Sequence, residues 1–312
     1  MSHSEANPSV VAVVVTYNRK ALLQECITAL LQSSYDNLQI AVVDNASTDG
    51  TGELVKSRFS NIPAVKYFNT GSNLGGAGGF NYGMKRAMEL GCDRIWLMDD
   101  DCIVRKDSLS ALIAEDQKLK GDFGFLCSKV LWKDGSMCRM NIPKISFTKK
   151  TDGSETADTT VIFCTFVSFY VKTETVREAG YPITDFFIWA DDLEYSRRIS
   201  RKHTCYFIPS SVVVHKSKNN IGSNLAADHS ENLSRYSYAY RNEYYVFRRE
   251  GIKGKIYYTL KVLYHKFKIR RSKDRAEYKI KLINEAVAEG RRFYPPVETV
   301  GSEGSIHESI GN

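Results

Sequence analysis

The sequence predicts an α/β protein with a mostly parallel central sheet, helices on both faces of that sheet, and a helical, basic region at the C-terminus. Short β-rich runs alternate with helical patterns up to about residue 216, which is typical of a parallel sheet with helical connections. Beyond residue 216 the composition becomes aromatic and basic, and no internal repeat is found. We therefore expect a sheet domain at residues 1–220, a helical basic subdomain at 221–294 and a flexible tail at 295–312.

Local patterns predict the individual elements in chain order. Runs rich in β-branched residues indicate strands, whereas apolar residues spaced by three and four, such as Leu23, Ile27 and Leu30, indicate helices. The expected elements are strands at 9–17, 38–44, 64–70 and 93–99, with helices at 20–33, 49–59 and 78–91. The C-terminal region predicts two or three helices, interrupted near Gly251 and Gly254.

Length and composition exclude several classes of protein. With 312 residues, 43% of them apolar, the chain can bury a full core. No apolar run approaches the roughly 18 residues of a membrane-spanning helix, and the N-terminal MSHSEANPSV lacks the pattern of a secretory signal. Seven cysteines without a CxxC pair favour free thiols in a reducing cytosol over a disulfide framework.

Polar residues follow each of the four predicted parallel strands. They are Thr16 and Arg19 after the first strand, Asp44 after the second, the glycine-rich NTGSNLGGAGG after the third, and Asp99 to Asp101 after the fourth. Because ligands bind at the carboxyl ends of such strands, these residues are expected to converge on one site. A nicotinamide-binding fingerprint is excluded, because the turn after the first strand, TYNRKA, contains no glycine.

The segment WLMDDDC places three aspartates at the end of an apolar strand. Adjacent carboxylates repel one another, and burying them without a positive partner is costly. Side chains alternate along an extended segment, so Asp99 and Asp101 point the same way while Asp100 points elsewhere. The cluster therefore requires a compensating positive charge, unless it is a solvated turn before the next helix.

Taken together, the motifs VVVTYNR, VVDNASTDGT, NLGGAGGFNYG, WLMDDD, FFIWADDLEYSRRI and PSSVVVHK resemble inverting family 2 glycosyltransferases with the GT-A fold. NLGGAGGFN and the spacing WxDDxEYxxR are most similar to the bacterial galactofuranosyltransferases and rhamnosyltransferases. The resemblance covers roughly residues 9–216, and YSYAYRNEYYV resembles a tyrosine-rich segment that follows the catalytic domain in relatives. It implies a metal-dependent hexosyltransferase.

The resemblance implies that Asp99 and Asp101 bind a divalent cation, Mn²⁺ or Mg²⁺, which bridges the diphosphate of a nucleotide-sugar. Hard cations prefer carboxylate oxygens, so the physical chemistry agrees. His215, at the end of a β-rich run, is implied as a third ligand. A lone histidine at a strand end is otherwise more often structural.

Catalysis by inversion requires a base that takes the proton of the attacking hydroxyl. The resemblance assigns this role to Asp192, with Asp191, Trp189 and Glu194 contacting the acceptor. Adjacent carboxylates raise each other's pKa, which helps one of them act as a base. The alternative is a helix N-terminus with acidic first-turn residues. The donor nucleotide is expected to contact Thr16, Arg19, Asp44, Asn73, Gly76 and Asp100.

The expected partners follow from the same resemblance. The donor is a UDP-sugar, with UDP-galactofuranose preferred and dTDP-rhamnose as the alternative. The acceptor is a lipid-linked glycan of a bacterial surface polysaccharide, which is O-antigen, capsule or cell wall galactan. The basic C-terminal helices would attach the protein to the anionic inner face of the cell membrane, or form a solvated structural face. No nucleic-acid partner is expected. The rival hypotheses are a sugar nucleotidyltransferase and a catalytically inactive relative.

Overall fold

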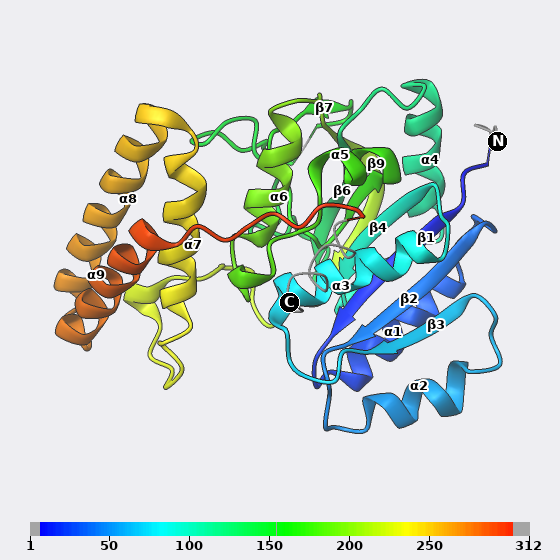
Figure 1. Cartoon of the computed structure of the whole chain (residues 1–312), viewed down its shortest axis with the longest axis horizontal. Coiled ribbons are helices and arrows are strands. Elements are labelled where there is room, and N and C mark those ends of the chain that lie inside the picture. The colour runs from blue at the N-terminus through cyan, green and yellow to red at the C-terminus, as the bar shows by residue number, and fades with distance from the viewer. Residues whose placement is uncertain (1–6, 154, 302–312) are drawn as a thin grey trace, which may run out of the picture.

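The computed structural model describes residues 7–153 and 155–301 (Figure 1). Within these residues nine strands form one sheet in the order β3-β2-β1-β4-β8-β6-β9-β5, with β7 paired to β9. The strands are β1 (Val10–Thr16), β2 (Leu38–Asp44), β3 (Val65–Asn69), β4 (Arg94–Asp99), β5 (Cys102–Val104), β6 (Phe125–Trp132), β7 (Thr159–Thr160), β8 (Phe169–Lys172) and β9 (Tyr206–His215).

Helices cover the sheet and form the C-terminal region (Figure 1). The α-helices are α1 (Lys20–Leu31), α2 (Thr51–Phe59), α3 (Gly75–Glu89), α4 (Ser108–Lys118), α5 (Thr173–Ala179), α6 (Asp191–Ser200), α7 (Tyr236–Arg248), α8 (Gly251–Ser272) and α9 (Ala276–Arg292). Two 3-10 turns, η1 (Thr184–Phe186) and η2 (Leu225–Ala227), complete the described elements. The break expected near Gly251 and Gly254 lies between α7 and α8, and Gly254 itself continues within α8.

The two halves of the sheet differ in strand direction. Strands β3, β2, β1 and β4 are parallel, as the alternating pattern predicts. Beyond β4 the sheet is mixed: β8 is antiparallel to β4 and β6, β9 is parallel to β6, and β5 and β7 are antiparallel to β9. The antiparallel strands follow turns and irregular segments instead of the regular helical crossovers of the first half.

Both faces of the sheet are buried, which explains the unbroken apolar sequence of β1. Val10, Ala12 and Val14 face a core completed by α1, α2 and α4. Val11 and Val13, on the opposite face, belong to a second core with α3, α5 and α6. Alternation along the strand therefore divides the apolar residues between two layers of helices.

Helices α7, α8 and α9 enclose a third apolar core, which also includes residues of η1 and α3. In Figure 1 these three helices stand side by side, beside the sheet and its covering helices. No helix in the described part of the chain combines the length and apolar character that a membrane span requires. All seven cysteines are buried and free, as their spacing predicts.

The segment after α9, the first part of the tail that the sequence predicts to be flexible, contacts the sheet domain. Residues 295–301 run back along the sheet domain (Figure 1). The Glu298 carbonyl accepts a hydrogen bond from the Tyr181 N–H at 2.9 Å, and its side chain accepts from Asn81 at 3.2 Å and pairs with Lys85. These contacts hold the segment against α3. Residues 302–312 lie outside the described part of the chain.

Candidate active site

The carboxyl ends of the parallel strands border a cleft of about 540 Å³, within the range of small-molecule sites. Most of the residues selected from the sequence line it: Thr16, Arg19, Asn73, Gly76, Asp99, Asp100, Asp101, Trp189 and His215. The lining does not include Asp44, Asp191, Asp192 or Glu194. The structure thus brings together residues from β1, β4, β9 and the loops before α3 and α6.

The three aspartates at the end of β4 have different partners. Asp100 accepts hydrogen bonds from the Thr16 hydroxyl at 2.7 Å and from the Arg19 guanidinium at 3.3 Å. The same guanidinium lies 2.9 Å from Asp101, and about half of the Arg19 side chain is exposed to the cleft. Arg19 therefore supplies part of the positive charge that the aspartates require.

Asp99, Asp101 and His215 form the candidate metal site, since one ligand atom of each lies within 4.8 Å of the others. Antiparallel pairing of β5 with β9 places His215 opposite Cys102, next to the aspartates. The His215 Nε2 lies 3.0 Å from an Asp101 carboxylate oxygen. Two carboxylates and one imidazole are a suitable donor set for Mn²⁺, and the carboxylates also suit Mg²⁺.

Electrostatics at this site favour a bound cation. Burial, followed by the charge of Asp101, raises the pKa of Asp99 to about 7. Burial alone would lower the pKa of His215, but the Asp101 carboxylate, Cys138 and the charge of Asp99 raise it to about 10. A divalent cation among these groups would offset the carboxylate repulsion and replace the imidazole proton.

Asn141 orients the His215 ring, a role that the sequence did not reveal. Its Oδ1 lies 2.8 Å from the His215 Nδ1, while its Nδ2 donates to the Thr165 hydroxyl at 2.8 Å. With the amide fixed in this direction, the imidazole Nδ1 carries the proton and Nε2 faces the aspartates. Such outer hydrogen bonds set the tautomer of metal-binding histidines.

The glycine-rich loop begins α3 at the edge of the cleft. Gly75 has a φ of +71°, and a Cβ there would lie 2.1 Å from the Phe187 carbonyl oxygen. The Asn73 side chain accepts from the Gly75 N–H at 2.9 Å, and Asn45 donates to the Gly75 carbonyl at 3.0 Å. Only glycine allows this close approach between the loop and the segment that precedes α6.

The segment that leads into the acidic pair is strained. Phe187, Trp189 and Ala190 have φ values of 59°, 67° and 61°, which side chains other than glycine rarely adopt. Trp189 lines the cleft, and its ring packs against Tyr236 with the centroids 5.0 Å apart. Strained residues persist only where their surroundings hold them, and they concentrate at functional sites.

Asn242 of α7 holds this turn. Its buried side-chain amide donates to the carbonyl oxygens of Phe186, Ile188 and Trp189 at 2.9, 3.1 and 2.9 Å. The C-terminal helices therefore shape the turn that carries the acidic pair. In the sequence this asparagine belongs to the "RN" pair of the tyrosine-rich segment. That pattern did not show which groups the asparagine contacts.

The acidic pair at the start of α6 has perturbed protonation. Burial raises the pKa of Asp192 to about 6. Burial, the charge of Asp192 and, more weakly, the charge of Asp99 raise the pKa of Asp191 well above its ordinary value. At neutral pH Asp192 is therefore ionised more readily than Asp191. The pKa of Asp191 also depends on the charge of Asp99 in the candidate metal site.

Two further residues selected from the sequence have carboxylates that are engaged by neighbouring protein groups. Glu194, expected to bind the acceptor, is buried and its carboxylate accepts from the Arg198 guanidinium at 3.1 Å, an ion pair within α6. Asp44, expected to contact the nucleotide, is fully buried and accepts from the Tyr67 hydroxyl at 2.7 Å and the Ser47 N–H at 2.8 Å. Both carboxylates stabilise loops and helices around the cleft.

Comparison with known proteins decides the family. The profile of glycosyl transferase family 2 matches residues 11–174, more than half of the chain. The chain belongs to glycosyl transferase family 2. This family 2 glycosyltransferase is 28% identical over 274 residues to galactofuranosyltransferase GlfT1 of Mycolicibacterium smegmatis, covering 81% of this chain and 86% of the relative.

A second relative and a solved structure extend the comparison. The GalNAc(5)-diNAcBac-PP-undecaprenol beta-1,3-glucosyltransferase of Campylobacter jejuni is 29% identical over 107 residues, 34% of each chain. The mannosyltransferase PcManGT of Pyrobaculum calidifontis, solved with GDP-Man and Mn²⁺, superposes with a TM-score of 0.52 at 15% identity, covering 93% of this chain and 77% of that one. The likeness shows the GT-A fold, and the family match makes this protein a transferase.

Proposed function

We propose that this enzyme transfers galactofuranose from UDP-galactofuranose, with inversion and with a divalent cation, to a hydroxyl of a lipid-linked glycan. The observation that carries the proposal is the candidate metal site in a cleft bordered by the glycine-rich loop and the strained turn. The preference for galactofuranose is supported by the similarity to GlfT1 over most of both chains. The rhamnosyl donor remains the alternative.

The donor would lie across the carboxyl ends of the strands. A cation bound by Asp99, Asp101 and His215 would stabilise the negative charge that develops on the leaving diphosphate. Arg19, half exposed beside the aspartates, would contact a phosphate oxygen. Gly76 lines the cleft, and the absence of a side chain permits close approach of the ligand to the backbone.

The acidic pair would act on the acceptor. Asp192, with a pKa of about 6, is ionised at neutral pH and takes the proton of the attacking hydroxyl. Asp191, whose pKa is raised further, retains a proton and donates a hydrogen bond to an acceptor oxygen. Trp189, beside the pair and in the cleft, would pack against a sugar ring.

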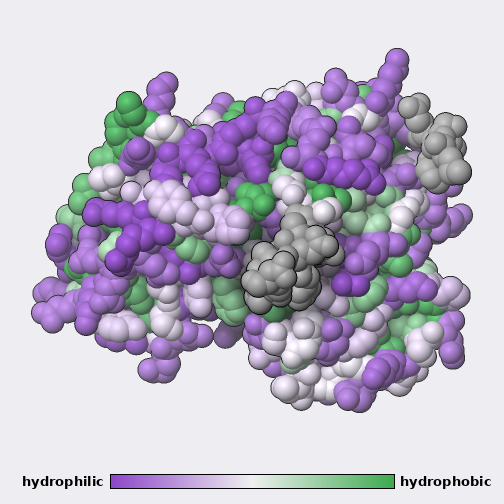
Figure 2. All heavy atoms as spheres, viewed as in Figure 1, coloured by the Kyte–Doolittle hydropathy of each residue, from purple (hydrophilic) through white to green (hydrophobic). Residues whose placement is uncertain are grey.

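In this proposal the enzyme acts at the cytoplasmic face of the cell membrane, and the composition of helix α8 supports membrane attachment. Its 22 residues include seven basic residues and no acidic ones. Figure 2 shows hydrophobic side chains along the edge of the molecule that α8 forms, next to hydrophilic ones. The exposed apolar stripe consists of Ile252, Ile256, Leu260, Leu263, Tyr264 and Phe267. Apolar and cationic groups on one helix suit an anionic bilayer surface.

A panel of nucleotide-sugars tests the proposal. The purified enzyme with Mn²⁺ and a lipid-linked glycan acceptor is incubated in turn with UDP-galactofuranose, dTDP-rhamnose and UDP-N-acetylglucosamine, and the released nucleotide is measured. We expect UDP-galactofuranose to be turned over fastest, and NMR of the transferred sugar to show inversion. Faster turnover of dTDP-rhamnose would contradict UDP-galactofuranose as the donor. Turnover of none of the three nucleotide-sugars would favour the hypothesis of a catalytically inactive relative.

A further inference from the structure

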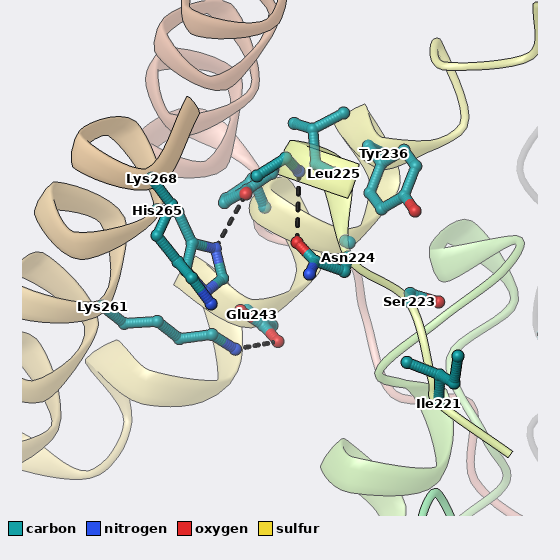
Figure 3. A pocket seen from close by; sticks show the side chains of 12 residues that line it. Ile221, Ser223, Asn224, Leu225, Tyr236, Glu243, Lys261, His265 and Lys268 are labelled. Atoms are coloured by element: carbon teal, nitrogen blue, oxygen red, sulfur yellow. Dashed lines mark hydrogen bonds and ion pairs between the residues drawn. The ribbon is translucent and has the colours of Figure 1, made fainter. Parts of the chain in front are cut away.

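A second cavity of about 330 Å³ lies between residues 221–226, α7 and α8 (Figure 3). Lys261 and His265 project into it from α8, and Asn224 faces them from the segment that follows β9. Tyr236 and Tyr240 of α7 complete its aromatic lining. We call this cavity the distal pocket.

The distal pocket is continuous with the cleft. A surface groove along residues 217–236 shares Arg19, Trp189, Ser217 and Lys218 with the cleft, and it shares Ile221, Ser223, Asn224 and Tyr236 with the distal pocket. The groove is also lined by asparagine, serine and aspartate side chains. The aromatic pair Trp189 and Tyr236 together with these hydrogen-bonding groups suits a chain of sugar rings, which present hydroxyls and apolar faces.

Helix α8 lines the distal pocket with two lysine side chains and one histidine side chain. Lys261, His265 and Lys268 recur at spacings of four and three, so they share one face of the helix. Lys261 is paired with Glu243 at 2.6 Å, and the Tyr240 hydroxyl lies 2.8 Å from the His265 Nδ1. Lys268, exposed over the Tyr264 ring, has no acidic partner among the described residues.

We propose that the distal pocket binds the phosphate-bearing end of the acceptor while its sugar chain occupies the groove and its terminal hydroxyl reaches the acidic pair. Lys268 supplies the positive charge, and the His265 ring and Asn224 amide supply hydrogen bonds. This inference rests on the proposed function and specifies the acceptor as a glycan joined to a phosphate or diphosphate.

The position of the pocket also agrees with the lipid that such an acceptor carries. The inner face of α8 lines the pocket, whereas its outer stripe of apolar residues is exposed. A phosphate bound in the pocket would therefore be separated only by helix α8 from the surface that is expected to meet the bilayer. The groove leads from that helix to the candidate metal site.

Farnesyl diphosphate serves as the probe, and its affinity is measured by calorimetry with saturating UDP and Mn²⁺ so that the donor site is occupied. We expect Lys268→Gln to weaken binding by about tenfold, since a hydrogen bond between charged groups is lost. The matched control is Lys253→Gln, another exposed lysine of α8 that does not line the pocket. Binding to this control should equal that of the unmodified enzyme.

Vesicles of phosphatidylglycerol separate a headgroup site from an acceptor site. We expect both lysine variants to reduce vesicle sedimentation alike, while only Lys268→Gln reduces affinity for farnesyl diphosphate. Equal loss of probe affinity in both variants, or no saturable binding by the unmodified enzyme, would overturn the inference. UDP binding with Mn²⁺, measured in the same proteins, tests the proposed function separately, because Lys268 lies outside the cleft.

Discussion

The two carboxyl groups at the start of α6 have unequal environments, although they are adjacent in sequence. The pKa of Asp192 is raised to about 6, chiefly by burial. Burial, followed by the charge of Asp192 and more weakly that of Asp99, raises the pKa of Asp191 well above its ordinary value. One group is therefore suited to accept a proton at neutral pH and the other to keep one.

Replacing Asp192 by asparagine keeps the shape of the side chain but removes the proton acceptor. We expect kcat to fall by about 10² to 10⁴-fold with little change in donor binding. Asp191→Asn is the matched control and should raise the acceptor KM more than it lowers kcat. If Asp191→Asn proves the more damaging for kcat, the roles within the pair are reversed.

The pH profile of the unmodified enzyme provides an independent check. A base must be deprotonated to act, so kcat should be retained above pH 6 and fall about tenfold per pH unit well below it. Stopped assays between pH 4.5 and 8 with saturating substrates would measure this. A rate that stays constant down to pH 4.5 would exclude Asp192 as the base.

At the scale of elements, the strained turn at residues 186–190 depends on two helices. Helix α3 approaches it through Gly75, and α7 holds it through Asn242. Neither contact is visible in the sequence, because the partners are far apart along the chain and the backbone carbonyls carry no sequence signature. The local cost of the left-handed residues explains why such support is needed.

Asn242→Ala should misplace the acidic pair. We expect a loss of about 1–3 kcal/mol in the free energy of unfolding, because buried carbonyls lose their donor, together with a clear fall in kcat. Asn242→Asp should be worse, since its carboxylate would face three carbonyl oxygens. Asn61→Ala, at an exposed asparagine, is the control and should leave both quantities unchanged. A normal kcat in folded Asn242→Ala would show that α7 does not position the turn.

The order of elements was predictable only where periodicity is strong. The parallel strands and their helices follow from apolar runs and spacings of three and four, and the structure has them close to the expected ranges. The antiparallel strands β5, β7 and β8 are short and carry no period of their own. Their pairing depends on long-range contacts, which also bring Asn141 to His215.

At the scale of the whole molecule, the site unites residues from both halves of the sheet and the C-terminal helices. The sequence could assign Asp99, Asp101 and His215 as ligands through resemblance, and the structure brings them together. The sequence did not show that Asp44 accepts a hydrogen bond from Tyr67 or that Glu194 pairs with Arg198, because a carboxylate at a strand end or helix start suits a ligand and a structural contact equally well. The local sequence pattern therefore indicates which residues could bind a ligand, and the tertiary structure determines which groups each of them contacts.

Attachment to membranes is a property of the whole surface of α8. Replacing Leu260, Leu263 and Phe267 by serine should reduce sedimentation with phosphatidylglycerol vesicles at least tenfold, since each exposed apolar side chain contributes on the order of 1 kcal/mol when inserted. The fold should be retained, because all three side chains are more than half exposed. Unchanged sedimentation, or no binding by the unmodified enzyme at low salt, would make this stripe a structural or protein-binding surface.

Calorimetric titration of UDP tests most directly whether the cleft binds a nucleotide through a divalent cation. The titrations use the unmodified enzyme with Mn²⁺, the same enzyme after complete metal removal with EDTA, and Asp101→Asn with Mn²⁺. We expect saturable binding in the first case and at least a tenfold loss of affinity in the other two, because the diphosphate would then face Asp99 and Asp100 without a bridging cation. Equal UDP affinity in all three titrations would contradict a metal-dependent nucleotide site at this cleft.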